Sequence, residues 1–139
     1  MPAWLLYSIL ALLAWGLWGF LPKVALGFLD PATAFVFEAF GGALTGLLVM
    51  LIFRPRLAGA PIQGILPAFF TGVLGYLGLI LFMYAIREGE KISIIAPLTA
   101  LYPVVTIGLA MIFLHEKINL VQFAGVVLAL ISILLISHQ

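Results

Sequence analysis

Long apolar runs separated by short polar breaks make up almost the whole chain. The runs cover residues 3–28, 32–53, 64–86, 92–114 and 120–137. A helix that crosses a bilayer needs about 20 mostly apolar residues, because each residue rises 1.5 Å across a hydrocarbon core about 30 Å thick. The first run is apolar to Leu21, and we expect its helix to continue past Pro22 to Phe28. The pattern predicts an all-α polytopic membrane protein with five transmembrane helices in a single domain, residues 1–139.

The polar breaks contain residues that end and begin helices. Asp30-Pro31 fits an N-cap followed by proline at the first helical position. The longest loop follows Arg54, and a charged turn surrounds Gly89. Asn119 is placed to cap the last helix.

Composition excludes most other classes of protein. Hydrophobic residues make up 65% of the 139 residues and charged residues 8%, whereas soluble domains carry about 25% charged residues. An ordinary cytosolic enzyme, a disordered segment and a nucleic-acid binder are therefore excluded. The chain has no Cys, which excludes a disulfide framework. We expect lipid as the surrounding partner, and as location the cytoplasmic (inner) membrane of a prokaryote.

Catalytic and metal-binding motifs are missing from the sequence. His115 and His138 are the only histidines, and both are expected at helix ends. We find no zinc-protease, nucleophile-elbow, phosphate-loop or dinucleotide-binding motif and no carboxylate cluster suited to a hard metal. The sequence predicts no enzyme activity, no cofactor and no metal.

The positive charges are almost balanced between the two sides of the membrane. With the N-terminus inside, three cations lie inside and three outside, whereas cytoplasmic loops usually carry the excess. The inner set is Arg54, Arg56 and Lys117, and the outer set is Lys23, Arg87 and Lys91. A chain without bias can insert in both orientations and pair with itself as an antiparallel homodimer. A single orientation, fixed by another signal, is the alternative.

Several short motifs, in order, resemble the five-helix repeat of the drug/metabolite transporter superfamily, the EamA-like domain. They are Trp15-Gly16 followed by Lys23, Pro31 at the start of the second helix, Tyr84 to Gly89, Pro97 to Val104, and Leu114 to Lys117 followed by Gln122 and Gly125. The chain departs from the family at Glu38, where many members carry Arg, and at Ser132, where Gly is expected. The resemblance implies half of a ten-helix inverted-repeat transporter, which needs a second, inverted copy or an inverted related chain.

Glu38 is the leading candidate for transport chemistry. It lies six positions after Ala32, about 9 Å into the second helix. An acidic residue inside a membrane helix is costly and suggests a functional site. Lys23 is the expected ion-pair partner, because both residues lie near the hairpin at Asp30. The pair either couples transport to proton exchange or serves as a fixed link between two helices.

Other candidates follow from aromatic, polar and small residues within the runs. We expect Trp15, Trp18, Tyr84, Tyr102 and Thr99 to line a substrate pocket with Glu38 and Lys23, where aromatic faces can hold an organic cation. The alternative is that the aromatic rings pack and the hydroxyls bond within their own helices. Pro97 and Pro103 predict a broken or kinked helix, and Gly42, Gly46 and Gly125 predict close helix packing.

These features favour a secondary active transporter of a small organic solute or metabolite, working by alternating access as an antiparallel dimer. The alternative is a structural or regulatory membrane subunit that acts only with a partner chain.

Overall fold

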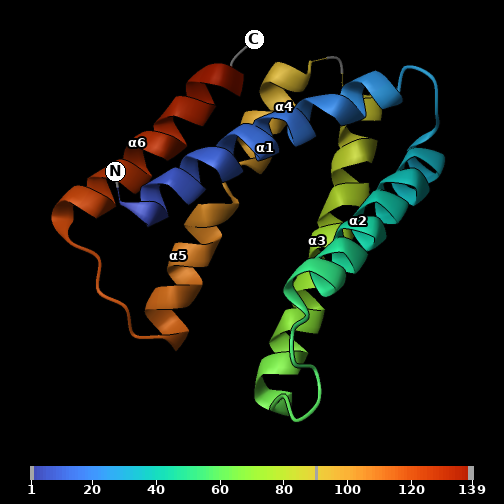
Figure 1. The fold of residues 1–139 in the computed structure, drawn as a ribbon. Coiled ribbons are helices and arrows are strands. Elements are labelled where there is room, and N and C mark those ends of the chain that lie inside the picture. The colour runs from blue at the N-terminus through green and yellow to red at the C-terminus, as the bar shows by residue number, and fades with distance from the viewer. Residues whose placement is uncertain (1, 90, 138–139) are drawn as a thin grey trace. The chain divides into compact units, whose positions relative to one another are not determined.

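The computed structural model describes residues 2–89 and 91–137, and all regular structure within them is helical (Figure 1). The helices are α1 (Ala3–Ala25), α2 (Pro31–Phe53), α3 (Ile62–Glu88), α4 (Ile92–Thr99), α5 (Tyr102–Phe113) and α6 (Leu120–Ser137). They form two compact units, residues 1–88 with α1 to α3 and residues 89–139 with α4 to α6. The all-helical fold is confirmed.

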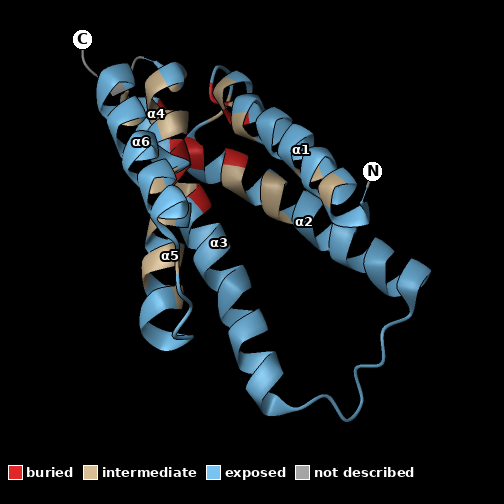
Figure 2. Ribbon diagram, turned by 90° about the vertical axis from the view of Figure 1, so that its left-hand side faces the viewer, coloured by how far each residue is buried: buried red, intermediate tan, exposed pale blue. Residues whose placement is uncertain are grey.

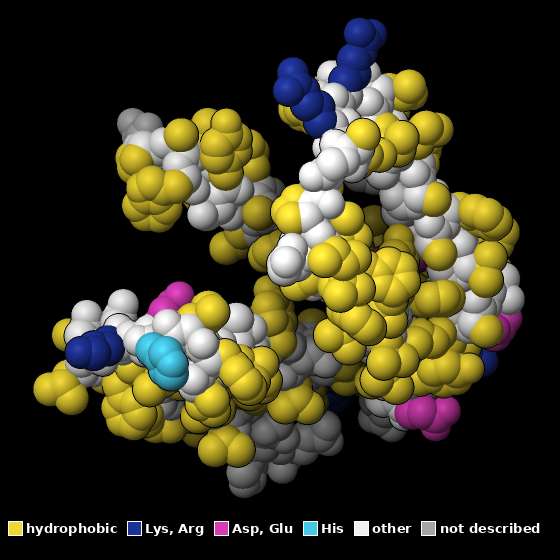
Figure 3. Space-filling model, turned by 90° about the horizontal axis from the view of Figure 1, so that it is seen from below, with side chains coloured by type: hydrophobic (Ala, Val, Ile, Leu, Met, Phe, Trp, Pro, Cys, Tyr) yellow, Lys and Arg dark blue, Asp and Glu magenta, His cyan; other side chains and the backbone are white. Residues whose placement is uncertain are grey.

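Within the described residues, four stretches are long and apolar enough to cross a membrane, and α6 is a shorter apolar helix. The four stretches are α1, α2, α3 and Ile92–Phe113, which contains both α4 and α5. Large apolar side chains cover most of the visible surface, and charged groups occupy only a few places on it (Figure 3). Because such a surface is poorly solvated by water, it suits the hydrocarbon of a bilayer.

In the first unit, α3 packs against both α1 and α2. The hairpin between α1 and α2 is short because Asp30 caps α2 directly. Its carboxylate accepts hydrogen bonds from the backbone N–H of Ala32 at 3.0 Å and of Thr33 at 3.1 Å, and from the Thr33 hydroxyl at 2.6 Å. The helix α1 ends at Ala25, three residues before the predicted end, because the chain turns at Gly27 and Phe28 with bonds of the i→i−3 type.

The small core of the first unit lies at the end where α1 stops, α2 starts and α3 stops (Figure 2). Its buried apolar residues are Leu26, Ala34, Leu79, Phe82, Met83 and Ile86. The four residues from α3 recur at spacings of three and four, so they share one face of that helix. This core holds the three helices in a fixed register at that end.

In the second unit, α4 packs against α6. The fourth predicted span is broken into α4 and α5 at Ala100 and Leu101. At the start of α6, the Asn119 side chain accepts from the Gln122 N–H and the Gln122 side chain accepts from the Asn119 N–H, both at 2.8 Å. This reciprocal pair is a capping box, so the predicted cap at Asn119 is confirmed.

Candidate functional site

Glu38 and Trp18 lie opposite each other on neighbouring helices. The indole N–H of Trp18 in α1 donates a hydrogen bond to carboxylate oxygen Oε1 of Glu38 in α2. The other carboxylate oxygen has no hydrogen-bond partner among the described residues. Glu38 is half-buried. The carboxylate of Glu38, within a predicted span, therefore has one oxygen that accepts from Trp18 and one oxygen that is open to another donor.

A third helix completes the site through aromatic packing. The ring of Phe82 in α3 stacks on Trp18 with centroids 6.0 Å apart and planes 18° apart. Phe82 is buried, whereas Trp18 is 45% exposed. Phe82 therefore supports one side of the indole while the rest of the ring stays accessible. Because Phe82 also belongs to the core, the Trp18–Glu38 pair is joined to the best-packed part of the unit.

One turn further along α2, the helix comes very close to α3. A Cβ atom added at Gly42 would lie 1.7 Å from the hydroxyl oxygen of Tyr76, so only glycine leaves room for that ring. The same ring makes an edge-on contact with Phe35, with centroids 5.9 Å apart. The predicted packing role is therefore supported at Gly42. A Cβ added at Gly46 or Gly125 would meet no atom of another described element within 4 Å, so the packing role of these two glycines stays a prediction.

The expected ion pair between Lys23 and Glu38 is not formed among the described residues. The reason is that Lys23 and Glu38 lie at different distances from the turn of the α1–α2 hairpin. Trp18 and Glu38 lie ten residues before and after Phe28, at the centre of the hairpin, whereas Lys23 lies only five residues before it. At 1.5 Å per residue, Lys23 is about 7.5 Å closer to the helix end than Glu38.

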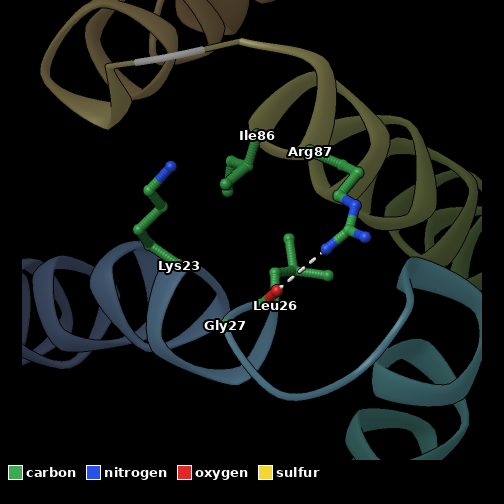
Figure 4. A pocket seen from close by; sticks show the side chains of 5 residues that line it. All are labelled: Lys23, Leu26, Gly27, Ile86 and Arg87. Atoms are coloured by element: carbon green, nitrogen blue, oxygen red, sulfur yellow. Dashed lines mark hydrogen bonds between the residues drawn. The ribbon is translucent and has the colours of Figure 1, made fainter.

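Lys23 instead lines a separate cavity of about 220 Å³ with Leu26, Gly27, Ile86 and Arg87 (Figure 4). The Arg87 guanidinium donates from Nη1 to the carbonyl oxygen of Leu26 at 3.2 Å. This bond joins the end of α3 to the turn after α1. Sequence reasoning placed Arg87 in a charged turn and did not identify this role.

Two other predicted pocket residues of the first unit, Trp15 and Tyr84, form no side-chain hydrogen bond with Glu38. Trp15 is 63% exposed and Tyr84 is 48% exposed, and neither ring contacts another ring among the described residues. Tyr102 and Thr99 belong to the second unit. The Thr99 hydroxyl bonds to the carbonyl oxygens of Ile95 and Ala96, both at 3.0 Å. For Thr99, the alternative of bonding within its own helix therefore holds.

The break between α4 and α5 lies between the two prolines singled out in the sequence. Pro97 lies inside α4, and Pro103 is in the first turn of α5. Since proline has no N–H, Pro103 cannot donate to the Thr99 carbonyl as a continuous helix requires. On either side of the break, two amides donate to the carbonyl oxygen three residues earlier, Leu101 to Leu98 at 3.2 Å and Val104 to Leu101 at 2.9 Å.

Comparison with known proteins assigns the family. Residues 2–138 match the EamA-like transporter family, which is nearly the whole chain. The chain belongs to the EamA-like transporter family. The resemblance seen in the sequence is confirmed, and with it an integral membrane protein that is not an enzyme. The EamA-like unit corresponds to half of a transporter, a size that suggests pairing with another unit.

An uncharacterized protein of Methanocaldococcus jannaschii is 40% identical to the EamA-like chain over 70 residues. These residues are 50% of this chain and 50% of the archaeal protein, so the match spans about half the length of that curated relative. Equal shares also mean that the two chains are similar in length. No solved structure matches the chain.

Proposed function

We propose that two copies of this chain, inserted in opposite orientations, form a secondary transporter that moves a small organic solute across the cytoplasmic membrane by alternating access. Family membership supports the transport class. The need for two units follows from the mechanism, because alternating access moves one repeat against an inverted one around a site near the midplane. The balance of three cations against three leaves both orientations open to one sequence.

The hydrogen bond between Trp18 and Glu38 carries the proposal for the coupling site. A carboxylate inside a membrane helix is retained where it binds an ion, a proton or a substrate. The open oxygen of Glu38 is available to a proton or to a cationic group of the solute. The exposed part of the indole next to it supplies an aromatic face that attracts organic cations. We therefore infer proton-coupled exchange, in which the proton and the solute compete for Glu38.

The broken helix supports the same proposal. Transporter sites often use helices that are interrupted inside the membrane, because freed carbonyl groups can meet the substrate and the break can bend. In this chain the Thr99 carbonyl loses the donor that residue 103 would supply. We assign Pro97 and Pro103 to this hinge, and Tyr102 to the substrate path beside it.

Transport in proteoliposomes tests this function. The full chain is reconstituted, tetraphenylphosphonium serves as the organic-cation probe, and an imposed proton gradient drives its movement. We expect Glu38→Gln to lower the rate of gradient-driven movement at least tenfold, because the amide oxygen still accepts a hydrogen bond from Trp18 but the amide cannot exchange a proton. Glu116→Gln removes a carboxylate from the loop before α6 and should leave transport unchanged.

Two outcomes would contradict the proposal. Equal transport by Glu38→Gln and the original chain would remove Glu38 from the coupling step. Neutral and anionic solutes are tested alongside the probe. If the original chain moves none of these compounds, the alternative of a subunit that acts with a partner chain is favoured.

A further inference from the structure

Two positively charged side chains line the cavity between the end of α1 and the end of α3. In Figure 4, Lys23 rises from α1 on one side, Arg87 comes from α3 on the other, and Ile86 lies between them. Leu26 and Gly27 form the remaining wall.

The charged groups of Lys23 and Arg87 are not ion-paired within the part of the chain that the structure describes. No carboxylate there forms an ion pair with Lys23 or Arg87. The nearest acid in the hairpin, Asp30, already accepts from two backbone amides and from the Thr33 hydroxyl. Because both side chains line the same cavity, an anion bound there would be attracted by two positive charges.

The donors that remain suit an oxyanion. Arginine has five N–H donors in a planar fork, and Arg87 uses Nη1 for the Leu26 carbonyl, which fixes the orientation of its guanidinium. The rest of the fork and the Lys23 ammonium remain available. Such forks bind phosphate and carboxylate groups, and lysine adds a mobile point charge. The cavity of about 220 Å³ is smaller than the roughly 300 Å³ typical of the smallest drug-sized pockets, so it fits a small anionic group.

The depth of the cavity along the helices suits a lipid headgroup. It lies at the end of the first unit, where α1 stops, α2 begins and α3 stops, with Asp30 and Arg87 close to the helix termini. In a protein that spans the bilayer, helix termini lie near the headgroup layer, where basic pockets between helices bind anionic lipid headgroups.

We propose that Lys23 and Arg87 form a binding site for a phosphate or carboxylate group at this boundary of the first unit. The group comes either from the headgroup of an anionic phospholipid or from a free anionic solute. The site does not use Glu38, so it stands whether or not the transport mechanism above is correct.

Native mass spectrometry of the full chain in neutral detergent tests the site. Dioleoyl phosphatidylglycerol is the anionic lipid, dioleoyl phosphatidylcholine is the lipid control, and inorganic phosphate is the competing free anion. We expect phosphatidylglycerol to bind and phosphatidylcholine to bind at least tenfold more weakly. Lys23→Gln should weaken phosphatidylglycerol binding about tenfold, the usual value of one charge-assisted hydrogen bond.

Two further variants make the result specific. Arg56→Gln removes one positive charge from the α2–α3 loop, at the other end of the unit, and should leave binding unchanged. Lys23→Arg keeps the charge and should retain binding. Arg87→Gln also breaks the bond to Leu26, so Lys23→Gln is the deciding variant because Lys23 makes no hydrogen bond among the described residues.

The competing anion identifies the source. Displacement of phosphatidylglycerol by millimolar phosphate supports a site open to free anions, and persistence of the lipid supports a headgroup site. Absence of both lipid and phosphate binding would overturn the proposal. Equal weakening in Lys23→Gln and Arg56→Gln would also overturn it, because the effect would then reflect total charge.

Discussion

Trp18 donates its indole hydrogen bond to Glu38 from the facing helix of a hairpin, and the two residues are equally far from Phe28 at its centre. Their equal depth makes the contact a consequence of the short turn that Asp30 permits. Phe82 then joins the pair to α3 by stacking on the indole. The acidic residue within α2 is thus held by two other helices.

The first prediction concerns this hydrogen bond. Trp18→Phe removes the donor but keeps an aromatic ring that can stack on Phe82. We expect the free energy of unfolding in detergent to fall by about 1 kcal/mol, within the range of interhelical hydrogen bonds in membrane proteins. Trp4→Phe is the matched control, because Trp4 is 68% exposed near the start of α1.

A double-mutant cycle makes this prediction sharper. If the bond exists, Trp18→Phe should cost much less in a Glu38→Leu background, where no acceptor remains. Equal costs in both backgrounds would show that the Trp18 ring contributes by packing alone.

The second prediction tests the close approach of α2 and α3. Gly42→Ala places a methyl group 1.7 Å from the Tyr76 hydroxyl oxygen and 3.0 Å from the adjacent ring carbon. The ring must move, and we expect a loss of about 1–3 kcal/mol, as for other overpacked sites. Gly46→Ala, four residues later in α2, should be neutral or stabilising because the site is open and alanine favours helix.

Removing the clashing oxygen should reverse part of this loss. The pair Gly42→Ala with Tyr76→Phe is expected to be more stable than Gly42→Ala alone, as measured by thermal unfolding in detergent. Equal stability of Gly42→Ala and Gly46→Ala would contradict the observed helix contact.

The third prediction concerns pH and the cap of α2. The hydrogen bond from the Thr33 hydroxyl, with those from the Thr33 and Ala32 amides, holds the pKa of Asp30 below its ordinary value. A lowered pKa means that the ionised form stabilises the folded state. This contribution is fully present above the pKa of the unfolded chain, about 3.9, and is lost as the pH falls through the folded value.

Asp30→Asn keeps a capping oxygen without the charge and isolates the effect. We expect the original chain to have the higher thermal midpoint at pH 6, with the difference shrinking as the pH falls below about 4. A difference that stays constant over this range would show that the charge of Asp30 does not contribute.

Much of the fold follows from the sequence because hydrophobic length and turn chemistry are local signals. The apolar runs gave the positions of the helices, and Asp30, Asn119 and the pair Pro97 and Pro103 marked two caps and the helix break. The relative positions of residues along the two helices of the hairpin were harder to predict. Lys23 and Glu38 are both near one hairpin, but the five-residue difference in their distance from its centre decides that Trp18 bonds to Glu38.

The candidate site was predicted only in part, because the sequence marks polar or bulky residues but not the apolar residues that pack against them. Glu38 and Trp18 differ from their apolar neighbours, so they could be recognised. Phe82 lies in α3, where nearly every residue is apolar, and no contrast with its neighbours marks it as the residue that packs on Trp18. Glycine patterns were also ambiguous, since Gly42 and Gly46 belong to the same motif but only Gly42 meets another helix.

The measurement that tests the proposed inverted pair most directly is the orientation of the chain in the membrane. Because the chain has no native Cys, Gly89→Cys and Ala60→Cys each supply one thiol, at opposite ends of α3. Intact cells are treated with a membrane-impermeant thiol reagent before and after permeabilisation. We predict that about half of the molecules react before permeabilisation at each position. Full labelling at one position and none at the other would show a single orientation and contradict the antiparallel pair.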